Sequence, residues 1–382
     1  MDVDYGIQLP VANAPAVLDL FCGCGGISWG LAKQGFRVVG GVDNWKMALQ
    51  TFKRNHRHAQ AIEADLAIVE PKELANAFRL KPGELDMLVG GPPCQGFSKN
   101  VPASRRFLRD EKNLLVRSFL RFVEHLRPKV VLMENVAEIV NAFDGAFTDE
   151  IRQLLKRWGY ETDVRVLDAT EYGVPQKRRR AFFFANRAGK PVRFPHQTHE
   201  PARSNENGSL FALPTMVTVW DAIGDLPSLR AGEGESPVEY PRSPKTDYQE
   251  MMRRDAEALY DHVARPLRPT QLARLKAIRA GEGAKHLPDH LKPKSYYSGA
   301  YGRLEKKGIA PTITRWVFHP GSGRFGHPVD DRVITIREAA RLQSFSDDFV
   351  FEGTYIQKSH QVGNAVPPAL SSTFAPLIHK VL

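Results

Sequence analysis

A single cysteine stands in a rigid turn at the end of a short apolar run. The run at 85–89 (LDMLV) ends in GGPP, and Cys94 follows at once. The two prolines hold φ at about −65° and remove two backbone donors, so this turn cannot continue as a helix. Open α/β sheets bind ligands at the carboxyl ends of their strands. Cys94 is therefore either a small residue filling a gap beside the turn or a nucleophile.

A carboxyl group follows a second, fully apolar run. Glu134 comes directly after VVLM at 130–133. At the same sheet edge as Cys94 this carboxyl is partly removed from water, which raises its pKa toward acid catalysis. A helix N-cap or a surface acid is the alternative. The thiol after the neighbouring strand favours catalysis.

Basic residues open a third apolar run. The sequence QKRRR at 176–180 leads into AFFFA at 181–185. Alternation along a strand sends Arg178 and Arg180 to one face and Arg179 to the other. Because this strand is predicted to be buried, at least one arginine is expected to point into the site.

A glycine-rich turn, FCGCGG at 21–26, follows the first apolar run. Its glycines, Gly23 and Gly25, let backbone N–H groups approach a ligand at the start of a helix. Asp43 ends the second run, where an acid accepts the ribose hydroxyls of a nucleotide-like cofactor. Asp65 follows the third run and is placed to accept a hydrogen bond from the amino group of an adenine. Phe21 can stack on the adenine ring.

Two other interpretations of this turn are disfavoured. The spacing Gly23-x-Gly25-x-x-Ser28 lacks the third glycine of the dinucleotide fingerprint, which argues against a NAD-dependent oxidoreductase. Cys22 and Cys24 have no two further ligands at sensible spacing, which argues against zinc. No metal is expected.

The elements that position these groups alternate between residues 16 and 185. Alternating strands and helices predict a doubly wound α/β domain with a mostly parallel sheet. After about residue 187 the chain becomes rich in Pro, Gly, Arg and Lys, which predicts a second, loop-rich domain with short helical pieces at 251–259 and 271–279. The predicted strands are 16–21, 36–42, 60–64, 85–90, 129–134, 162–167 and 180–185, and the predicted helices are 27–34, 46–55, 72–78, 114–126, 149–158 and 336–343.

Composition sets the class and the environment. The 382 residues are 42% hydrophobic and 25% charged, as in a globular protein of two or three domains. No apolar run reaches 18 residues and no signal pattern opens the chain, so no membrane partner is expected. Three cysteines fit reduced thiols in a cytosol. A net charge of +10 and a pI of about 9.5 favour phosphate-backbone binding or serve solubility alone.

The ordered motifs resemble the DNA (cytosine-5)-methyltransferase family of the bacterial restriction–modification type. The motifs stand in the family's order, and the stretch 188–304 carries none of them, as is expected of that family's target-recognition region. They are DLFCGCGG, Asp43, GGPPCQGFS, ENV, QKRRR, the segment RVITIREAARLQSF at 332–345 and QVGNAVPP at 361–368.

This resemblance implies an S-adenosylmethionine-dependent, Rossmann-like methyltransferase fold with an inserted, smaller, loop-rich target-recognition domain. Residues 15–196 would form the first part of the catalytic domain and 197–358 the target-recognition domain. Residues 359–382 would return to complete the catalytic domain. Some basic residues of the insert would meet phosphates; they are Arg242, Lys245, Arg253, Arg254, Arg265, Arg268, Arg274, Lys276 and Arg279.

The resemblance also implies the reaction, which is methyl transfer from S-adenosylmethionine to carbon 5 of a flipped-out cytosine in a specific double-stranded DNA sequence. Cys94 would attack carbon 6, and Glu134 would hold or protonate ring nitrogen 3. Arg178 and Arg180 would bind the base carbonyl and orient Glu134. The enamine would take the methyl group, and loss of the carbon 5 proton with elimination of the thiol would release 5-methylcytosine.

The resemblance places S-adenosylmethionine against residues from both ends of the chain. One departure concerns Trp45, which follows Asp43 by two residues, whereas in the family an aromatic commonly follows the acid directly. This departure argues against a stacking role for Trp45. The implied cofactor residues are Phe21, Gly23, Gly25, Asp43, Asp65 and Asn364.

Two alternatives share these motifs or this fold: a tRNA cytosine-5 methyltransferase and a non-catalytic DNA-binding regulator. The long basic insert favours duplex DNA, and the intact Cys94, Glu134 and Arg178 argue against a regulator. We expect a monomer in the bacterial cytosol or nucleoid that binds double-stranded DNA. A cognate restriction endonuclease acting separately is a candidate partner.

Overall fold

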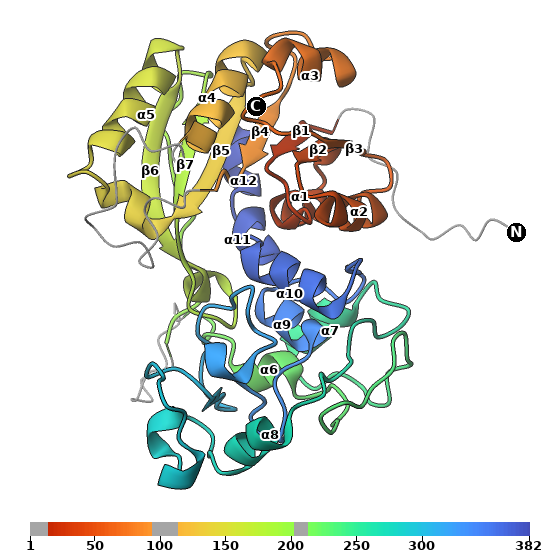
Figure 1. The fold of residues 1–382 in the computed structure, drawn as a ribbon. Helices are drawn as coiled ribbons and strands as arrows, with labels where there is room; N and C mark the ends of the chain where they lie inside the picture. The colour runs from red at the N-terminus through yellow and green to blue at the C-terminus, as the bar shows by residue number, and fades with distance from the viewer. Residues whose placement is uncertain (1–13, 94–113, 202–212) are drawn as a thin grey trace, which may run out of the picture.

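The chain folds into an upper lobe built on a β-sheet and a lower lobe made mostly of loops and short helices (Figure 1). The computed structural model describes residues 14–93, 114–201 and 213–382. The C-terminal helices run from the lower lobe back to the sheet, so the C-terminus lies in the upper lobe (Figure 1). No helix in these three ranges is long and apolar enough to cross a membrane.

The upper lobe is organised by a seven-stranded sheet with the order β3-β2-β1-β4-β5-β7-β6. The strands from β1 to β5 run parallel, and β7 is antiparallel to both β5 and β6. This arrangement confirms the predicted mostly parallel α/β sheet. The strands are β1 Ala16–Leu20, β2 Arg37–Asp43, β3 Gln60–Glu63, β4 Met87–Gly90, β5 Val130–Val136, β6 Glu161–Asp168 and β7 Arg179–Asn186.

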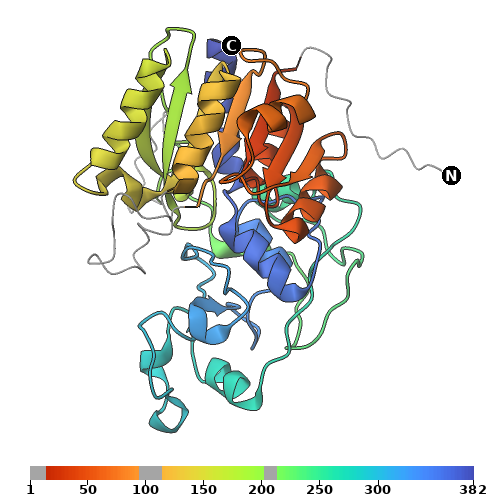
Figure 2. The same cartoon turned by 45° about the horizontal axis from the view of Figure 1, so that its top comes forward.

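Helices cover both faces of the sheet because the central strands are apolar on both sides. Leu88 and Val131 lie in a core with α3, α4 and α5, whereas Val89 and Leu132 lie in a second core with α1 and the C-terminal helices. Figure 2 shows the two helical layers from another side. The helices of the upper lobe are α1 Gly26–Ala32, α2 Lys46–Asn55, α3 Pro71–Ala77, α4 Leu114–Leu126 and α5 Ala146–Arg157, with 3-10 turns η3 Ala137–Asn141 and η4 Ala169–Tyr172.

Helix α10 (Tyr355–Asn364) packs in the lower-lobe core through Val362, and the last two helices, α11 (Pro368–Ser372) and α12 (Ala375–Val381), complete the second layer. Helix α11 packs directly on α1. A Cβ on Gly30 would stand 2.1 Å from the Pro368 carbonyl oxygen, and Ser371 Oγ donates to the Ile27 carbonyl at 3.1 Å. The two ends of the chain therefore form one layer.

The lower lobe has its own core, to which α6, α7 and α9 contribute. Its remaining chain is loop and short turns. The elements are α6 Val219–Ile223, α7 Asp247–Arg253, α8 Pro269–Lys276, β8 Gly302–Arg303, β9 Arg324–Gly326 and α9 Ile336–Leu342, with 3-10 turns η5 Ala284–His286, η6 Asp289–Leu291 and η7 Pro320–Ser322.

A buried ionic cluster holds α9 inside the lower lobe. Arg341 is fully buried, and its guanidinium contacts Asp225 Oδ1 at 2.5 Å and Asp347 Oδ2 at 2.6 Å. Buried charges cost free energy unless each one is paired, so this cluster depends on every member.

Replacing Arg341 by methionine is expected to lower the free energy of unfolding by about 3 to 5 kcal/mol, because both partner carboxylates remain buried. Urea denaturation measures this loss. The exposed Arg157 on α5 supplies the control, since Arg157→Met is expected to change stability by less than about 0.5 kcal/mol. Equal stability of the two variants would contradict the assignment of the cluster.

Candidate active site

The glycine turn after β1 takes a left-handed backbone path. Gly23 has a φ of 53° and Gly25 a φ of 93°, and Phe21 before them has 56°. A Cβ on Gly25 would stand 2.8 Å from Phe52 Cδ2 on α2, so a side chain is excluded there. The turn thus brings bare backbone to the N-terminal end of α1, as a ligand-binding turn requires.

Asp43 closes the turn from the end of β2. Its Oδ2 accepts from the Gly23 N–H at 2.8 Å, and its Oδ1 accepts from the Trp45 N–H at 2.8 Å. Burial raises the pKa of Asp43, although these backbone donors oppose the shift. The carboxylate keeps further lone pairs for a hydroxyl donor.

Asp65 and Asn364 lie at the same end of the sheet. Asp65 follows β3, which is the neighbour of β2, and its side chain is exposed. Asn364 is exposed at the last position of α10. That end of α10 approaches the glycine turn, because Cys24 Sγ donates to the Gln361 carbonyl at 3.9 Å.

Asp19 is a buried acid that sequence reasoning did not assign to the site. It lies on β1, and Ser28 Oγ donates to its Oδ2, whereas its Oδ1 is buried without a hydrogen-bond partner. Burial raises the pKa of Asp19 to about 7, and the charge of Asp43 adds to the shift. An acid within an otherwise apolar strand was the available signal in the sequence.

The variant Asp19→Asn is expected to change how stability depends on pH. The folded protein keeps the Asp19 proton up to about pH 7, whereas the unfolded chain releases it near pH 4. As pH rises from about 5 to about 8, the free energy of unfolding of the wild type therefore falls by roughly 3 kcal/mol through this group. The variant lacks the titrating group and does not show this fall. Urea denaturation of both proteins at these pH values measures the difference, and parallel pH dependences would contradict it.

Cys22 and Cys24 are buried thiols. Burial raises the pKa of Cys24 to about 12, and burial together with nearby carboxylates raises the pKa of Cys22. Both therefore stay protonated near neutral pH and are poor nucleophiles. Within the described ranges, no three His, Cys, Asp or Glu side chains gather as a metal site.

The acid Glu134 is paired with an arginine from the antiparallel neighbour strand. In the register of β5 and β7, Val136 faces Arg180, and Arg180 Nε lies 2.9 Å from Glu134 Oε1. Glu134 is 8% exposed, and burial raises its pKa despite the nearby charges of Arg180 and Arg178. The geometry therefore favours a carboxyl group that can hold a proton.

The turn after β4 packs against Glu134 and its neighbour Asn135. A Cβ on Gly91 would stand 3.2 Å from Glu134 Oε2, and Asn135 Nδ2 donates to the Pro92 carbonyl at 3.0 Å. Asn135 is buried and was not assigned from the sequence, although it follows Glu134 directly. Cys94, two residues after Pro92, lies outside the described residues.

Arg178 is buried on the inner side of the strand, whereas Arg179 is exposed, as the alternation predicts. Its guanidinium does not bond Glu134. Instead, Nη1 donates to the Ile313 carbonyl at 3.2 Å and Nη2 to the Gly363 carbonyl at 3.3 Å, while Nε is buried without a partner. Arg178 acts on Glu134 through its charge alone.

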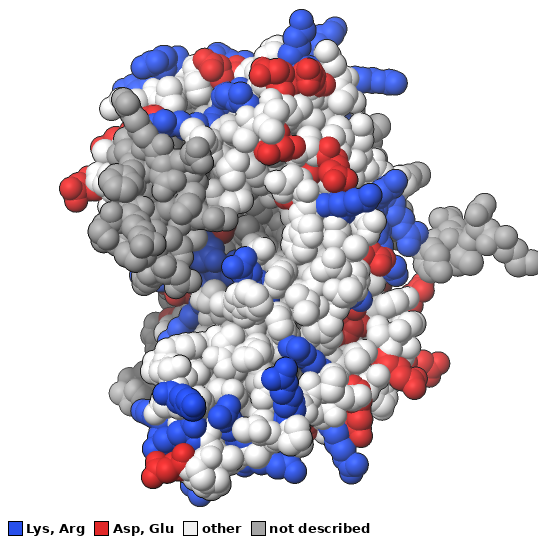
Figure 3. All heavy atoms as spheres, in the orientation of Figure 1, with Lys and Arg blue, Asp and Glu red and all other residues white. Residues whose placement is uncertain are grey.

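A segment of the lower lobe runs along the entry to β7. Ala310 N–H donates to the Pro175 carbonyl at 3.1 Å, and Ile313 N–H donates to Gln176 Oε1 at 2.8 Å. The space-filling view in Figure 3 shows a hollow between the two lobes, with Lys and Arg gathered on the lower lobe. The segment therefore joins the lower lobe to the residues that lead into β7.

The parallel sheet, the glycine turn after β1 and the acid after β2 define the fold of an S-adenosylmethionine-dependent methyltransferase. A family model described as C-5 cytosine-specific DNA methylase matches residues 16–380. The chain belongs to this family and is a DNA cytosine-5 methyltransferase, as the sequence motifs predicted.

Named relatives agree with this family. Type II methyltransferase M.AgeI of Thalassovita gelatinovora is 32% identical, over 94% of this chain and 98% of the relative. Type II methyltransferase M.DdeI of Desulfomicrobium norvegicum is also 32% identical, over 95% of this chain and 88% of the relative. A solved Escherichia coli structure has a similar fold, with a TM-score of 0.76 and 25% sequence identity. The protein is encoded within a prophage and described as a DNA modification methyltransferase. The match covers 96% of this chain and 99% of that protein.

Proposed function

We propose that this enzyme methylates carbon 5 of a flipped-out cytosine in a specific double-stranded DNA sequence through a covalent bond to Cys94. The observation that carries the proposal is the buried, Arg180-paired Glu134 against the Gly91-Pro92 turn that leads to Cys94. A proton-holding carboxyl beside a cysteine is what addition of a thiolate to a pyrimidine ring needs.

The roles of the residues follow from this chemistry. Glu134 donates a proton to ring nitrogen 3, which makes carbon 6 electrophilic, and the Cys94 thiolate adds there. Arg180 orients Glu134 and binds the base carbonyl, while Arg178 holds the Ile313 and Gly363 carbonyls beside the site. The resulting enamine takes the methyl group at carbon 5. Loss of the carbon 5 proton and elimination of the Cys94 thiolate then restore the ring, and the nitrogen 3 proton returns to Glu134. The base must leave the helix because carbon 6 is not accessible to a side chain within the stack.

The family implies S-adenosylmethionine as the methyl donor, and residues at the end of β1 and β2 fit such a cofactor. The unpartnered Asp19 Oδ1 suits a cationic or hydrogen-bond-donating group, and Asp43 suits hydroxyl groups. When bound, the cofactor supplies an activated methyl group on a sulfonium. We assign its binding to Phe21, Gly23, Gly25, Asp43, Asp65 and Asn364, with Asp19 added.

We also propose the division of the chain into a catalytic domain of 15–196 with 359–382 and a target-recognition domain of 197–358. The packing of α11 on α1 supports the return of the C-terminal segment, and a core built mainly from lower-lobe residues supports the insert. Because curated relatives are named type II methyltransferases, a cognate endonuclease acting separately remains a candidate partner.

Methyl transfer from labelled S-adenosylmethionine tests the substrate. Purified protein is incubated with unmethylated duplex DNA and, in parallel, with unmodified tRNA. We expect label in cytosine carbon 5 of the DNA and none in the tRNA. Label in tRNA alone would overturn the DNA substrate, and label in neither would favour a non-catalytic regulator.

A further inference from the structure

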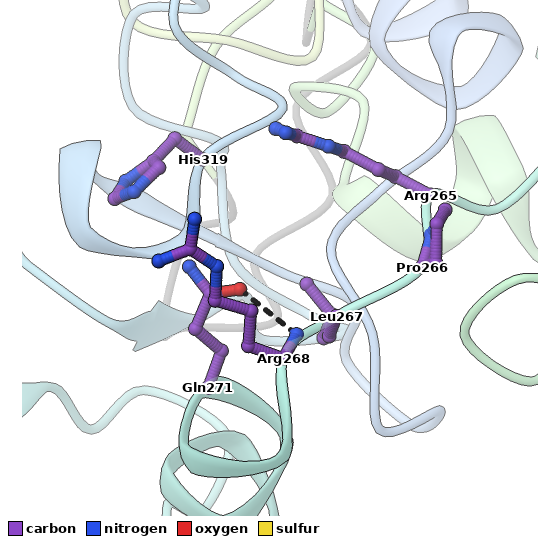
Figure 4. A pocket seen from close by; sticks show the side chains of 6 residues that line it. All are labelled: Arg265, Pro266, Leu267, Arg268, Gln271 and His319. Carbon is purple, nitrogen blue, oxygen red and sulfur yellow. Dashed lines mark hydrogen bonds between the residues drawn. The ribbon is translucent and has the colours of Figure 1, made fainter.

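A cavity of about 410 Å³ opens in the lower lobe, away from Glu134 and the glycine turn. Figure 4 shows its wall, in which side chains from the loop before α8 face His319 from the segment that leads to η7. Three of the six lining residues carry basic groups and none is acidic. They are Arg265, Pro266, Leu267, Arg268, Gln271 and His319.

The guanidinium of Arg265 is held in place without a carboxylate. Arg265 Nη1 donates to the Phe318 carbonyl at 3.2 Å, and the guanidinium lies over the Phe318 ring at 4.8 Å from its centroid. Within the described part of the chain, neither Arg265 nor Arg268 has a carboxylate within 4.0 Å. Two positive charges therefore face one cavity, and no carboxylate of the described residues pairs with either.

The third basic group is arranged as a neutral donor. His319 Nδ1 accepts from the Gly321 N–H at 3.1 Å, so its proton resides on Nε2. Partial removal from water, together with repulsion from Arg265 and Arg268, lowers the pKa of His319. An anion in the cavity relieves this repulsion, and a planar guanidinium fork matches the oxygens of a phosphate.

The chain itself connects this cavity to the active site. Thr312 Oγ1 donates to the Lys177 carbonyl at 2.6 Å, next to Arg178, and the same segment continues to His319 at the cavity. The seven peptide units from Thr312 to His319 reach at most about 25 Å, so one short segment links the cavity to the Lys177 carbonyl.

We propose that the cavity between Arg265, Arg268 and His319 binds one backbone phosphate of the duplex that carries the target cytosine. This inference rests on the proposed function, because it takes duplex DNA as the ligand. The contact fixes the position of the duplex on the enzyme and carries no base specificity.

Binding of a 30-base-pair duplex as a function of salt tests the proposal, with Arg268→Gln compared with wild type. Arg268 is exposed and forms no ion pair with the described residues, so the fold does not depend on it. Arg157→Gln on α5 is the matched control with the same change of charge. We expect Arg268→Gln to raise Kd roughly tenfold for duplexes with and without the methylated site, and to lower the salt slope by about 0.9.

A second arm identifies the phosphate. Single phosphates around the methylated cytosine are replaced by uncharged methylphosphonates. In the wild type, one of these positions is expected to weaken binding, and in Arg268→Gln that position is expected to have no further effect. Equal Kd values and salt slopes for Arg268→Gln and Arg157→Gln would overturn the phosphate site. If the wild type still methylated duplex DNA in that case, the proposed function would stand. A wild type that neither binds nor methylates duplex DNA would overturn both.

Discussion

Replacing Cys94 by serine is expected to reduce methyl transfer to DNA by at least roughly 10⁴-fold, because a hydroxyl is a far weaker nucleophile than a thiolate near neutral pH. The same variant is expected to lose covalent trapping. DNA carrying 5-fluorocytosine at the target should become attached to the wild-type protein with S-adenosylmethionine present, because fluorine at carbon 5 blocks the loss of a proton that ends the reaction.

Denaturing gel electrophoresis of the DNA–protein adduct provides the measurement. The buried thiol of Cys22 supplies the control, and the variant Cys22→Ala is expected to trap DNA as the wild type does. An adduct that persists in Cys94→Ser would contradict the assignment of the nucleophile.

Replacing Glu134 by glutamine is expected to lower kcat by about 10²- to 10⁴-fold, because an amide cannot give a proton to ring nitrogen 3. DNA affinity should change little, since the amide keeps the size of the side chain and can still donate a hydrogen bond. Single-turnover methylation and DNA binding, measured on the same preparation, separate these effects.

The pH dependence of the wild type follows from the direction of the Glu134 shift. Burial raises the pKa of Glu134, so the protonated form extends to higher pH than for an exposed glutamate. The rate of methyl transfer should therefore fall as pH rises through this pKa, and Glu134→Gln should lose that fall. The exposed Glu161 provides the matched control, and Glu161→Gln should retain the wild-type profile. A wild-type kcat in Glu134→Gln would contradict the assigned role.

Local pattern was enough to predict the elements of the upper lobe. Helix α4 begins at Leu114 and ends at Leu126, as predicted, because its apolar residues repeat with the helical period. The strand β5 was predicted from its uninterrupted apolar run, which is what burial on both faces produces. Strand alternation placed Arg178 and Arg180 on one face, and the family resemblance implied the pairing of an arginine with Glu134 that Arg180 makes.

The lower lobe was harder to predict because its contacts are distant in sequence. A helix was predicted at 251–259, but α7 covers Asp247–Arg253, since the Thr246 side chain accepts from the Gln249 N–H at 3.2 Å and starts the helix earlier. The bridge between Gln176 and Ala310 joins segments more than one hundred residues apart, and no local periodicity marks it.

Buried polar groups of the site were missed for a related reason. Asp19 and Asn135 stand inside quoted motifs, but their roles depend on the side chains around them. The unpartnered Oδ1 of Asp19 and the bond from Asn135 to the Pro92 carbonyl are visible only in three dimensions. Asp19 refines the site beside the glycine turn, and Asn135 refines it at the turn that leads to Cys94.

Bisulfite sequencing of genomic DNA from a methylation-free host that expresses this chain tests the central claim most directly. A host expressing Cys94→Ser at the same level is sequenced beside it. We expect cytosine methylation at one short sequence motif with the wild type and none with the variant. Unmethylated DNA from a well-expressed wild type, or methylation that survives in the variant, would contradict a sequence-specific DNA methyltransferase acting through Cys94.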